Sequence, residues 1–162
     1  MHYIALAQAL ILLALANGSP VIARRIFGNA WATPVDGNTL FIDGRPLLGP
    51  SKTIRGLIVS LLACTIGALL LGFHIWLGLL VATTAMAGDL LSSFFKRRLH
   101  LPPSSRATGL DQIPESLFPL LACRTPLSLS AIDIGAGCAI FFVGELLLSV
   151  LFFRLKLRDR PY

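Results

Sequence analysis

The sequence predicts an all-α integral membrane protein, a bundle of five transmembrane helices forming a single membrane domain over residues 1–162. Of the 162 residues, 55% are hydrophobic and only 14% are charged, whereas a soluble domain has about 25% charged residues. Apolar runs of about 20 residues, the length that crosses a bilayer, recur along the chain. The positive charges gather between these runs, as in membrane proteins of fixed orientation.

Five spans are expected in order along the chain, at about residues 3–22, 56–72, 75–95, 113–129 and 129–153. The second is uncharged throughout, and the third carries one acid, Asp89, near its end. Asn17 and Pro20 should interrupt the first span, and the backbone groups that such a break frees must line a polar space or be buried in protein. The fourth span is the weakest, because it contains Glu115, Arg124 and three prolines.

The distribution of positive charge predicts the orientation. With five spans and the N-terminus outside, 13 of the 14 Lys and Arg residues lie on one side, in loops at about 23–55 and 96–112 and in the C-terminal tail. Such a bias marks the cytoplasmic side. We therefore expect a protein of the cytoplasmic membrane with both loops and the C-terminus inside. A cleaved signal peptide is the alternative for the first run, but no cation precedes it.

The net charge of +6 is explained by this topology and does not indicate nucleic-acid binding. The basic residues are not interleaved with exposed aromatic or polar residues, as they are in proteins that bind nucleic acids. We expect no nucleic-acid partner.

Polar side chains follow one another along the end of the third span. On a helix Asp89, Ser92, Ser93 and Lys96 are spaced i, i+3, i+4 and i+7 and so share one face. A charged group is costly in hydrocarbon, so this face should line the bundle interior or a wet cavity. One alternative is that Asp89 pairs with an Arg and only ties helices together. The other is that Asp89 belongs to a functional site.

Cations and further acids follow directly after this face. Basic triplets such as Lys96-Arg97-Arg98 usually anchor the cytoplasmic end of a helix. Beside acids they also suit a metal-bound polyphosphate, because Arg and Lys bind phosphate oxygens and carboxylates bind Mg²⁺. Asp111 and Glu115, spaced i, i+4, would supply such carboxylates. The alternative for Asp111 is to cap the fourth span.

The stretch GPSKTIRG, residues 49–56, resembles a phosphate-binding P-loop but lacks its spacing, since Lys does not directly follow a Gly. Lys52, Thr53 and Arg55 nevertheless stand at the start of the second span. Free backbone N–H groups and the helix dipole attract phosphate at such a position. The alternative is that Lys52 and Arg55 only anchor the helix end.

Taken in order, these residues resemble the signature of membrane cytidylyltransferases, and most closely that of the CDP-archaeol synthase family. CDP-diglyceride synthetase is a more distant resemblance, because its Lys-Asp pair and His-Gly-Gly have no counterpart here. The features that carry the resemblance are Asn17…Pro20, Asp36-Gly37, Gly49…Lys52-Thr53…Arg55-Gly56, Gly88-Asp89-Leu90…Ser93…Lys96-Arg97-Arg98 and Gly109-Leu110-Asp111-Gln112.

The resemblance implies an enzyme that moves CMP from CTP to a phosphatidate-like lipid phosphate and releases pyrophosphate, with Mg²⁺ as cofactor. It implies that Asp89 and Asp111 bind the metal and that Lys96 joins them in catalysis. The residues it implies for nucleotide and phosphate binding are Lys52, Thr53, Arg55, Ser93, Arg97 and Arg98. Further candidates are Asn17, Asp36, Gln112 and Glu115.

Two other functions fit the composition. A small membrane transporter subunit would place polar groups near the bilayer midplane, whereas here they gather at one interface. A non-catalytic protein that binds anionic lipid or assists assembly would need only the basic loops, and would leave Asp89 and Asp111 unexplained. The sequence leaves open the lipid tail, ether-isoprenoid or diacyl, as well as the number of metal ions, the preference for CTP over dCTP and the oligomeric state.

Overall fold

Five α-helices make up the fold in a computed structural model of the chain, which describes residues 2–102, 105 and 107–154, with side chains as far as residue 149. The helices are α1 (Tyr3–Phe27), α2 (Ile54–Leu70), α3 (Ile75–Arg98), α4 (Gln112–Ala122) and α5 (Ala131–Arg154). The predicted all-α class is confirmed. In this part of the chain, three helices, α1, α3 and α5, are long and apolar enough to cross a membrane.

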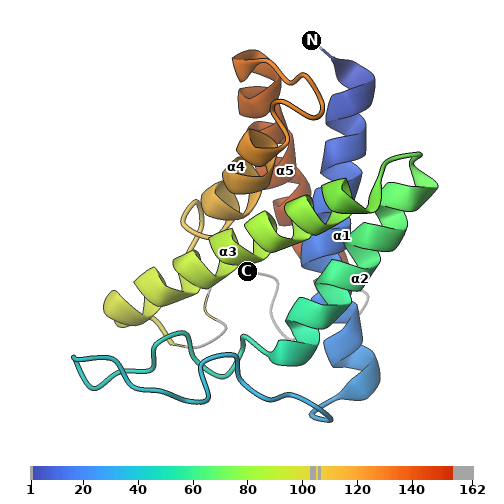
Figure 1. The fold of residues 1–162 in the computed structure, drawn as a ribbon. Helices are drawn as coiled ribbons and strands as arrows, with labels where there is room; N and C mark the ends of the chain where they lie inside the picture. The colour runs from blue at the N-terminus through green and yellow to red at the C-terminus, as the bar shows by residue number, and fades with distance from the viewer. Residues whose placement is uncertain (1, 103–104, 106, 155–162) are drawn as a thin grey trace.

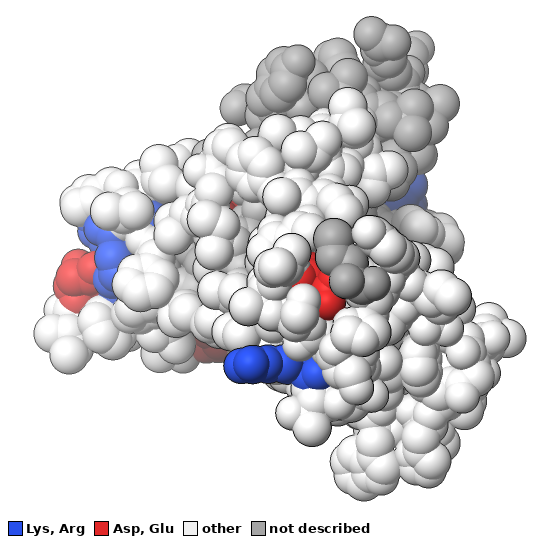
Figure 2. All heavy atoms as spheres, turned by 90° about the horizontal axis from the view of Figure 1, so that it is seen from above, with Lys and Arg blue, Asp and Glu red and all other residues white. Residues whose placement is uncertain are grey.

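The helices are gathered into one bundle (Figure 1). α1 packs against α2 and α3, and α4 packs against α3 and α5. The N-terminus and the turn between α4 and α5 lie at one end of the bundle. The end of α1, the start of α2, the end of α3 and the long loop 28–53 lie at the other. Seen from the first end, the surface is mostly uncharged, with charged side chains in a few small groups (Figure 2).

The core lies where α1, α2 and α3 meet, and small residues allow these helices to approach closely. Leu12, Cys64 and Val81 are fully buried there. A Cβ atom at Gly78 of α3 would lie 2.5 Å from the Cys64 carbonyl oxygen of α2. Such small-residue contacts are typical of helices packed within membranes.

α1 does not break where an interruption was expected. It runs without a gap through Asn17 and Pro20 to Phe27, so that prediction is wrong. A proline removes one backbone hydrogen bond, and membrane helices tolerate the loss where a neighbouring helix packs against it. Here α2 supplies the packing, because a Cβ atom at Gly56 would lie 3.5 Å from Pro20 Cβ.

α4 begins where the fourth span was expected to begin but is only 11 residues long. At about 1.5 Å per residue it extends for about 17 Å, about half the thickness of the hydrocarbon layer. Turns follow it, in which Ser128 has a left-handed backbone conformation with φ 52°. Whether α2 and α4 each cross the membrane therefore stays a prediction. The C-terminal tail from residue 155, expected inside, lies outside the described residues, as does Arg106.

Candidate functional site

The Asp89 carboxylate is the centre of a charged cluster inside the bundle. Lys52 Nζ, from the loop before α2, lies 2.5 Å from both of its oxygens. The Glu115 side chain, from the first turn of α4, also hydrogen-bonds with Asp89. The Lys52 and Asp89 side chains are only 20% and 17% exposed. Three separate segments thus bring two acids and one cation together.

Lys52 is held in place by its neighbour and remains charged. Thr53 caps α2, because its side chain accepts a hydrogen bond of 3.2 Å from the Gly56 N–H. Burial alone would lower the pKa of Lys52, but the Asp89 carboxylate outweighs it, so that the pKa lies above its usual value. Lys52 therefore presents a full positive charge at neutral pH.

A second pair lies at the end of α3. Lys96 Nζ lies 2.7 Å from Asp111 Oδ1 and donates a hydrogen bond of 3.1 Å to the Ser105 carbonyl. Asp111 Oδ2 accepts one from the Ala107 N–H, at 3.1 Å. The Asp111 side chain does not cap α4, so the structure does not support the alternative role considered for it.

The two pairs belong to one cluster. Lys96 interacts electrostatically with Asp89, and Asp111 does so with Lys52. Glu145 of α5 likewise interacts with Glu115. The polar face predicted for the third span thus meets charges from the loop before α2 and from the start of α4, and Asp89 and Asp111 interact with the same two lysines, Lys52 and Lys96.

A glycine sets the distance between α3 and α4 at this cluster. A Cβ atom at Gly88 would lie 2.3 Å from the Pro114 carbonyl oxygen and 2.8 Å from the Glu115 backbone nitrogen. Only Gly fits such an approach without displacing backbone. Gly88 therefore lets Asp89, the next residue, reach the Glu115 side chain.

Several buried polar atoms next to the cluster have no hydrogen-bond partner. They are Ser93 Oγ and Arg97 Nε and Nη1, whereas Arg97 Nη2 donates a hydrogen bond of 3.0 Å to the Pro102 carbonyl. Ser93 is 2% and Arg97 4% exposed, and both lie on the same side of α3 as Asp89 by their spacing. Buried polar groups in folded proteins nearly always have partners. These atoms are therefore buried donors that are free to bind the acceptor oxygens of a ligand.

Arg98, the third member of the basic triplet, lies away from the cluster. Its guanidinium donates hydrogen bonds of 2.9 Å to Asp43 Oδ1 and 2.7 Å to the Pro46 carbonyl. It also lies over the Phe41 and Phe94 rings, 4.6 and 5.0 Å from their centres. Arg98 thus fixes the tip of the long loop to the end of α3.

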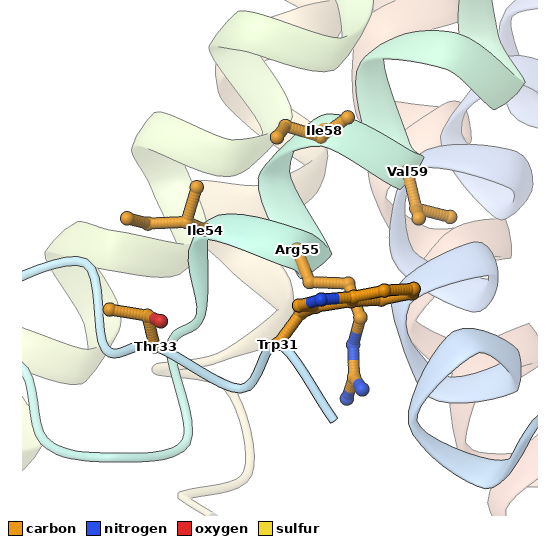
Figure 3. Close-up of a pocket in the computed structure, with 6 residues that line it drawn as sticks. All are labelled: Trp31, Thr33, Ile54, Arg55, Ile58 and Val59. Carbon is orange, nitrogen blue, oxygen red and sulfur yellow. The ribbon is translucent and has the colours of Figure 1, made fainter. Parts of the chain in front are cut away.

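Arg55 also holds the loop. Its Nη1 donates hydrogen bonds to the Gly28 and Ala30 carbonyls, the former at 3.1 Å. The Arg55 stem borders an open, mostly apolar groove of about 300 Å³ between the loop and α2, and Figure 3 shows its guanidinium directed away from Ile58 and Val59. The residues that line this groove are Trp31, Thr33, Ile54, Arg55, Ile58 and Val59. None of these described residues carries a carboxylate.

The remaining candidates make local bonds. Asn17 Nδ2 donates to the Leu13 carbonyl of its own helix, at 3.2 Å. Gln112 Oε1 accepts a hydrogen bond of 2.8 Å from the Gly109 N–H and so closes the turn before α4. The Asp36 carboxylate binds backbone N–H groups within the long loop. Each of these side chains shapes backbone around the cluster.

Charged side chains gathered among apolar helices define a helical membrane protein with a charged cluster between its helices. The comparisons with known proteins agree with this class. A family profile described as "CarS-like: CDP-archaeol synthase" matches residues 69–162. The CDP-archaeol synthase of Sulfurisphaera tokodaii is 35% identical over all of this chain and 98% of its own length. That of Hyperthermus butylicus is 39% identical over 60% of this chain and 59% of its own length.

A solved structure, described as an intramembrane enzyme for archaeal membrane lipid biosynthesis, has the same fold. It matches with a TM-score of 0.68 and 27% identity, over 86% of this chain and 92% of its own. The chain therefore belongs to the CDP-archaeol synthase family, and the resemblance predicted from its motifs is confirmed.

Proposed function

We propose that the chain is a CTP-dependent cytidylyltransferase, which transfers CMP from CTP to a lipid phosphate in the membrane and releases pyrophosphate. Membership of the CDP-archaeol synthase family supports the reaction. The observation that carries it is the intramembrane cluster of Lys52, Lys96 and Arg97 with Asp89 and Asp111. A polyphosphate with a bound metal ion suits such a cluster, because its phosphates can bind the cations and its metal ion the carboxylates.

The phosphates of CTP are proposed to bind the cations of this cluster. Arg97 Nε and Nη1 and Ser93 Oγ are buried donors without partners, and phosphate oxygens would accept from them. Lys52 and Lys96 would turn from their carboxylates to phosphate oxygens, joined by the free N–H groups at the start of α2, which Thr53 caps. We assign Arg55 and Arg98 to holding the loop instead, because the guanidinium group of each already binds two acceptors there. In the described part of the chain, Arg97 binds one acceptor, the Pro102 carbonyl, through Nη2 at 3.0 Å.

The carboxylates fit the cofactor that the family resemblance implies. Mg²⁺ is usually held by one or two carboxylates, with phosphate oxygens and water completing its shell. Asp111 Oδ1 is paired with Lys96 Nζ at 2.7 Å and becomes available when Lys96 turns to phosphate, and Asp89 lies beside Glu115. We propose Asp89 and Asp111 as ligands, with Glu115 as a further one. When bound, Mg²⁺ neutralises negative charge on the phosphate oxygens. In the described part of the chain, no three His, Cys, Asp or Glu side chains form a metal site by themselves, so CTP would complete the shell.

The reaction needs no activated side-chain nucleophile, because an oxygen of the lipid phosphate is itself one. That oxygen forms a bond to the α-phosphorus of CTP as the bond from this phosphorus to the bridging oxygen of the β-phosphate breaks, and pyrophosphate carries away the electron pair. Lys52, Lys96 and Arg97 hold the phosphates in line and stabilise the charge that develops on the leaving group. The contribution of the protein is position and charge.

The lipid chain is proposed to lie between α2 and α3. An open apolar groove of about 170 Å³ there is lined by Leu57, Leu61, Thr83, Met86, Ala87 and Leu90. Leu90 directly follows Asp89, so a hydrocarbon chain in this groove would bring its phosphate to the charged cluster. An archaeol-type lipid phosphate is the first substrate to test, because the relatives are CDP-archaeol synthases.

The proposed topology is five crossings, with the N-terminus outside and the site cytoplasmic. The cations that end α1 and α3 lie at the same end of the bundle as the long loop (Figure 1), as the positive-inside rule requires. α2 would cross as a short helix, and α4 would cross together with the turns that follow it, with the backbone of these turns covered by neighbouring helices. CTP would then enter from the cytoplasm between the loops 28–53 and 99–111.

The reaction is tested with the purified protein in lipid nanodiscs, CTP labelled in the α-phosphate, Mg²⁺ and a panel of lipid phosphates. We expect labelled CDP-lipid and an equal amount of pyrophosphate from at least one ether or diacyl lipid phosphate. The Asp43→Asn variant, changed on the exposed loop, should keep the activity. No labelled lipid from any member of the panel would refute the proposed function.

A further inference from the structure

We propose that Asp36 is a positioning residue for Lys52, which it holds in the charged cluster without touching the cluster itself. The inference rests on the proposed function only for its kinetic consequence. The hydrogen bonds of the loop 28–53 support it. In the described part of the chain, none of them joins Asp36 to the side chains of Asp89, Lys96 or Asp111.

The Asp36 carboxylate gathers three backbone N–H groups from the two ends of the loop's tip. Its Oδ2 accepts hydrogen bonds of 2.8 Å from Leu48 and 2.9 Å from Gly49, and its Oδ1 accepts one of 3.1 Å from Asn38. Residues 37–47 are thereby closed into a compact tip. The other end of this tip is fixed by Arg98, so the whole segment is held at two points.

Gly49, bound in this way, begins the turn that leads to Lys52. The Lys52 N–H donates to the Gly49 carbonyl at 3.3 Å, and the Lys52 carbonyl accepts from the Val35 N–H at 2.8 Å. Val35 directly precedes Asp36. The backbone of Lys52 is therefore tied on one side to the residue before Asp36 and on the other to a residue that Asp36 binds.

The chemistry of the carboxylate suits this role. Burial alone would raise the pKa of Asp36, but the N–H groups of Gly49, Leu48 and Asn38 outweigh it, so that the pKa lies below its usual value. An Asn at this position would offer only one acceptor oxygen, and its NH₂ group would face an N–H. Since the carboxylate oxygens are already occupied, Asp36 has little capacity left to bind a ligand.

Asp43 supplies a matched control in the same loop. Its Oδ1 also closes a turn, by accepting a hydrogen bond of 3.1 Å from the Arg45 N–H, and it pairs with Arg98. Among the described residues, its hydrogen bonds and ion pair join it to Arg45 and Arg98 and not to the segment that presents Lys52. An effect that passes through Lys52 should therefore follow from changing Asp36 and not from changing Asp43.

The kinetic test is a double-variant cycle with Asp36→Ala and Lys52→Met. We expect Asp36→Ala to raise KM for CTP by about tenfold with a smaller change in kcat, as for the loss of a charge-assisted hydrogen bond. In the Lys52→Met background the same change should have almost no effect, because the two residues act as a unit. Asp36→Asn should act in the same direction as Asp36→Ala but less strongly, and Asp43→Asn should leave KM unchanged. Effects that add in the double variant would overturn the inference.

A second measurement does not depend on activity. In the folded protein without nucleotide, labelling by an amine-acylating reagent should be faster at Lys52 in Asp36→Ala and Asp36→Asn than in the wild type, with Lys96 as the internal reference. Equal Lys52 labelling in all the variants would overturn the inference, whatever the reaction proves to be. A protein that transfers no CMP but shows the labelling difference would keep the positioning role and refute the proposed function alone.

Discussion

Lys52 and Asp89 form a buried ion pair in which one ammonium nitrogen lies 2.5 Å from both carboxylate oxygens. The two residues come from different segments of the chain, 37 positions apart. The pair holds the loop 28–53 against α3. In the proposed reaction, Lys52 would bind a phosphate and Asp89 a metal ion.

Removing one partner of this pair should destabilise the protein, because the other charge is then left buried without its counterion. We expect Lys52→Met and Asp89→Asn each to lower the free energy of unfolding by about 2 kcal/mol. The double variant should be more stable than the sum of the two effects predicts, yet be as inactive as Asp89→Asn. Thermal unfolding in detergent measures the stability. Strictly additive losses would show that the two side chains do not interact.

Gly88→Ala should disturb the contact between α3 and α4. The added Cβ would lie 2.3 Å from the Pro114 carbonyl oxygen, and overpacking of this kind costs about 1–3 kcal/mol. Activity should fall as well, because Asp89 and Glu115 would be moved apart. Gly135→Ala in α5, which would meet no atom within 4 Å, is the control in the same unfolding assay. Equal stabilities of the two variants would contradict the close approach described here.

Arg97 and Arg98 should differ sharply although they are adjacent. Arg97→Met should raise KM for CTP by about tenfold or more, since its unpartnered nitrogens are proposed to bind phosphate. Arg98→Met should change KM little but make the loop tip easier to cleave by protease, because its bonds to Asp43 and Pro46 are lost. Steady-state kinetics and limited proteolysis of both variants test this. The opposite assignment of the two effects would refute it.

The sequence could predict the polar face of α3, since Asp89, Ser93 and Lys96 recur at helical spacing. It could not tell Arg97 from Arg98. Successive residues on a helix differ by about 100° in direction, and only the packing of α3 decides which of two adjacent cations faces the cluster. The order of the motifs along the chain was enough to predict the family, because this prediction needs no knowledge of how side chains are placed in space.

Other features depended on contacts that spacing does not reveal. From the sequence, Glu115 was a weaker candidate than Asp111, because acids are also common in the first turn of a helix. Only the close approach of α3 and α4 at Gly88 brings the Glu115 side chain to Asp89. The fourth span was placed at 113–129 because the distribution of positive charge requires a crossing there, and charge does not reveal that the helix ends at Ala122 and is followed by turns. The break expected at Pro20 did not occur, since α2 packs against it.

The loop held by Asp36 should open at acidic pH. The folded pKa of Asp36 is below its ordinary value of 3.8, so its contribution to stability is complete above about pH 4 and is lost as the pH falls through the folded value. Pepsin should therefore cleave residues 37–47 slowly in the wild type at about pH 5 and faster toward about pH 2. Asp36→Asn should be cleaved readily over this whole pH range. The ratio of its cleavage rate to that of the wild type should therefore approach one at low pH. A ratio that does not change with pH would contradict this.

The central claim is that Asp89 and Asp111 together hold the divalent ion on CTP. Binding of Mn²⁺, used in place of Mg²⁺ and followed by electron paramagnetic resonance, tests it most directly. The purified wild type and Asp43→Asn should bind Mn²⁺ strongly only when CTP is added, and Asp89→Asn and Asp111→Asn should each lose most of that bound signal, with a smaller loss for Glu115→Gln. Undiminished CTP-dependent Mn²⁺ binding in a folded Asp89→Asn or Asp111→Asn protein would contradict it.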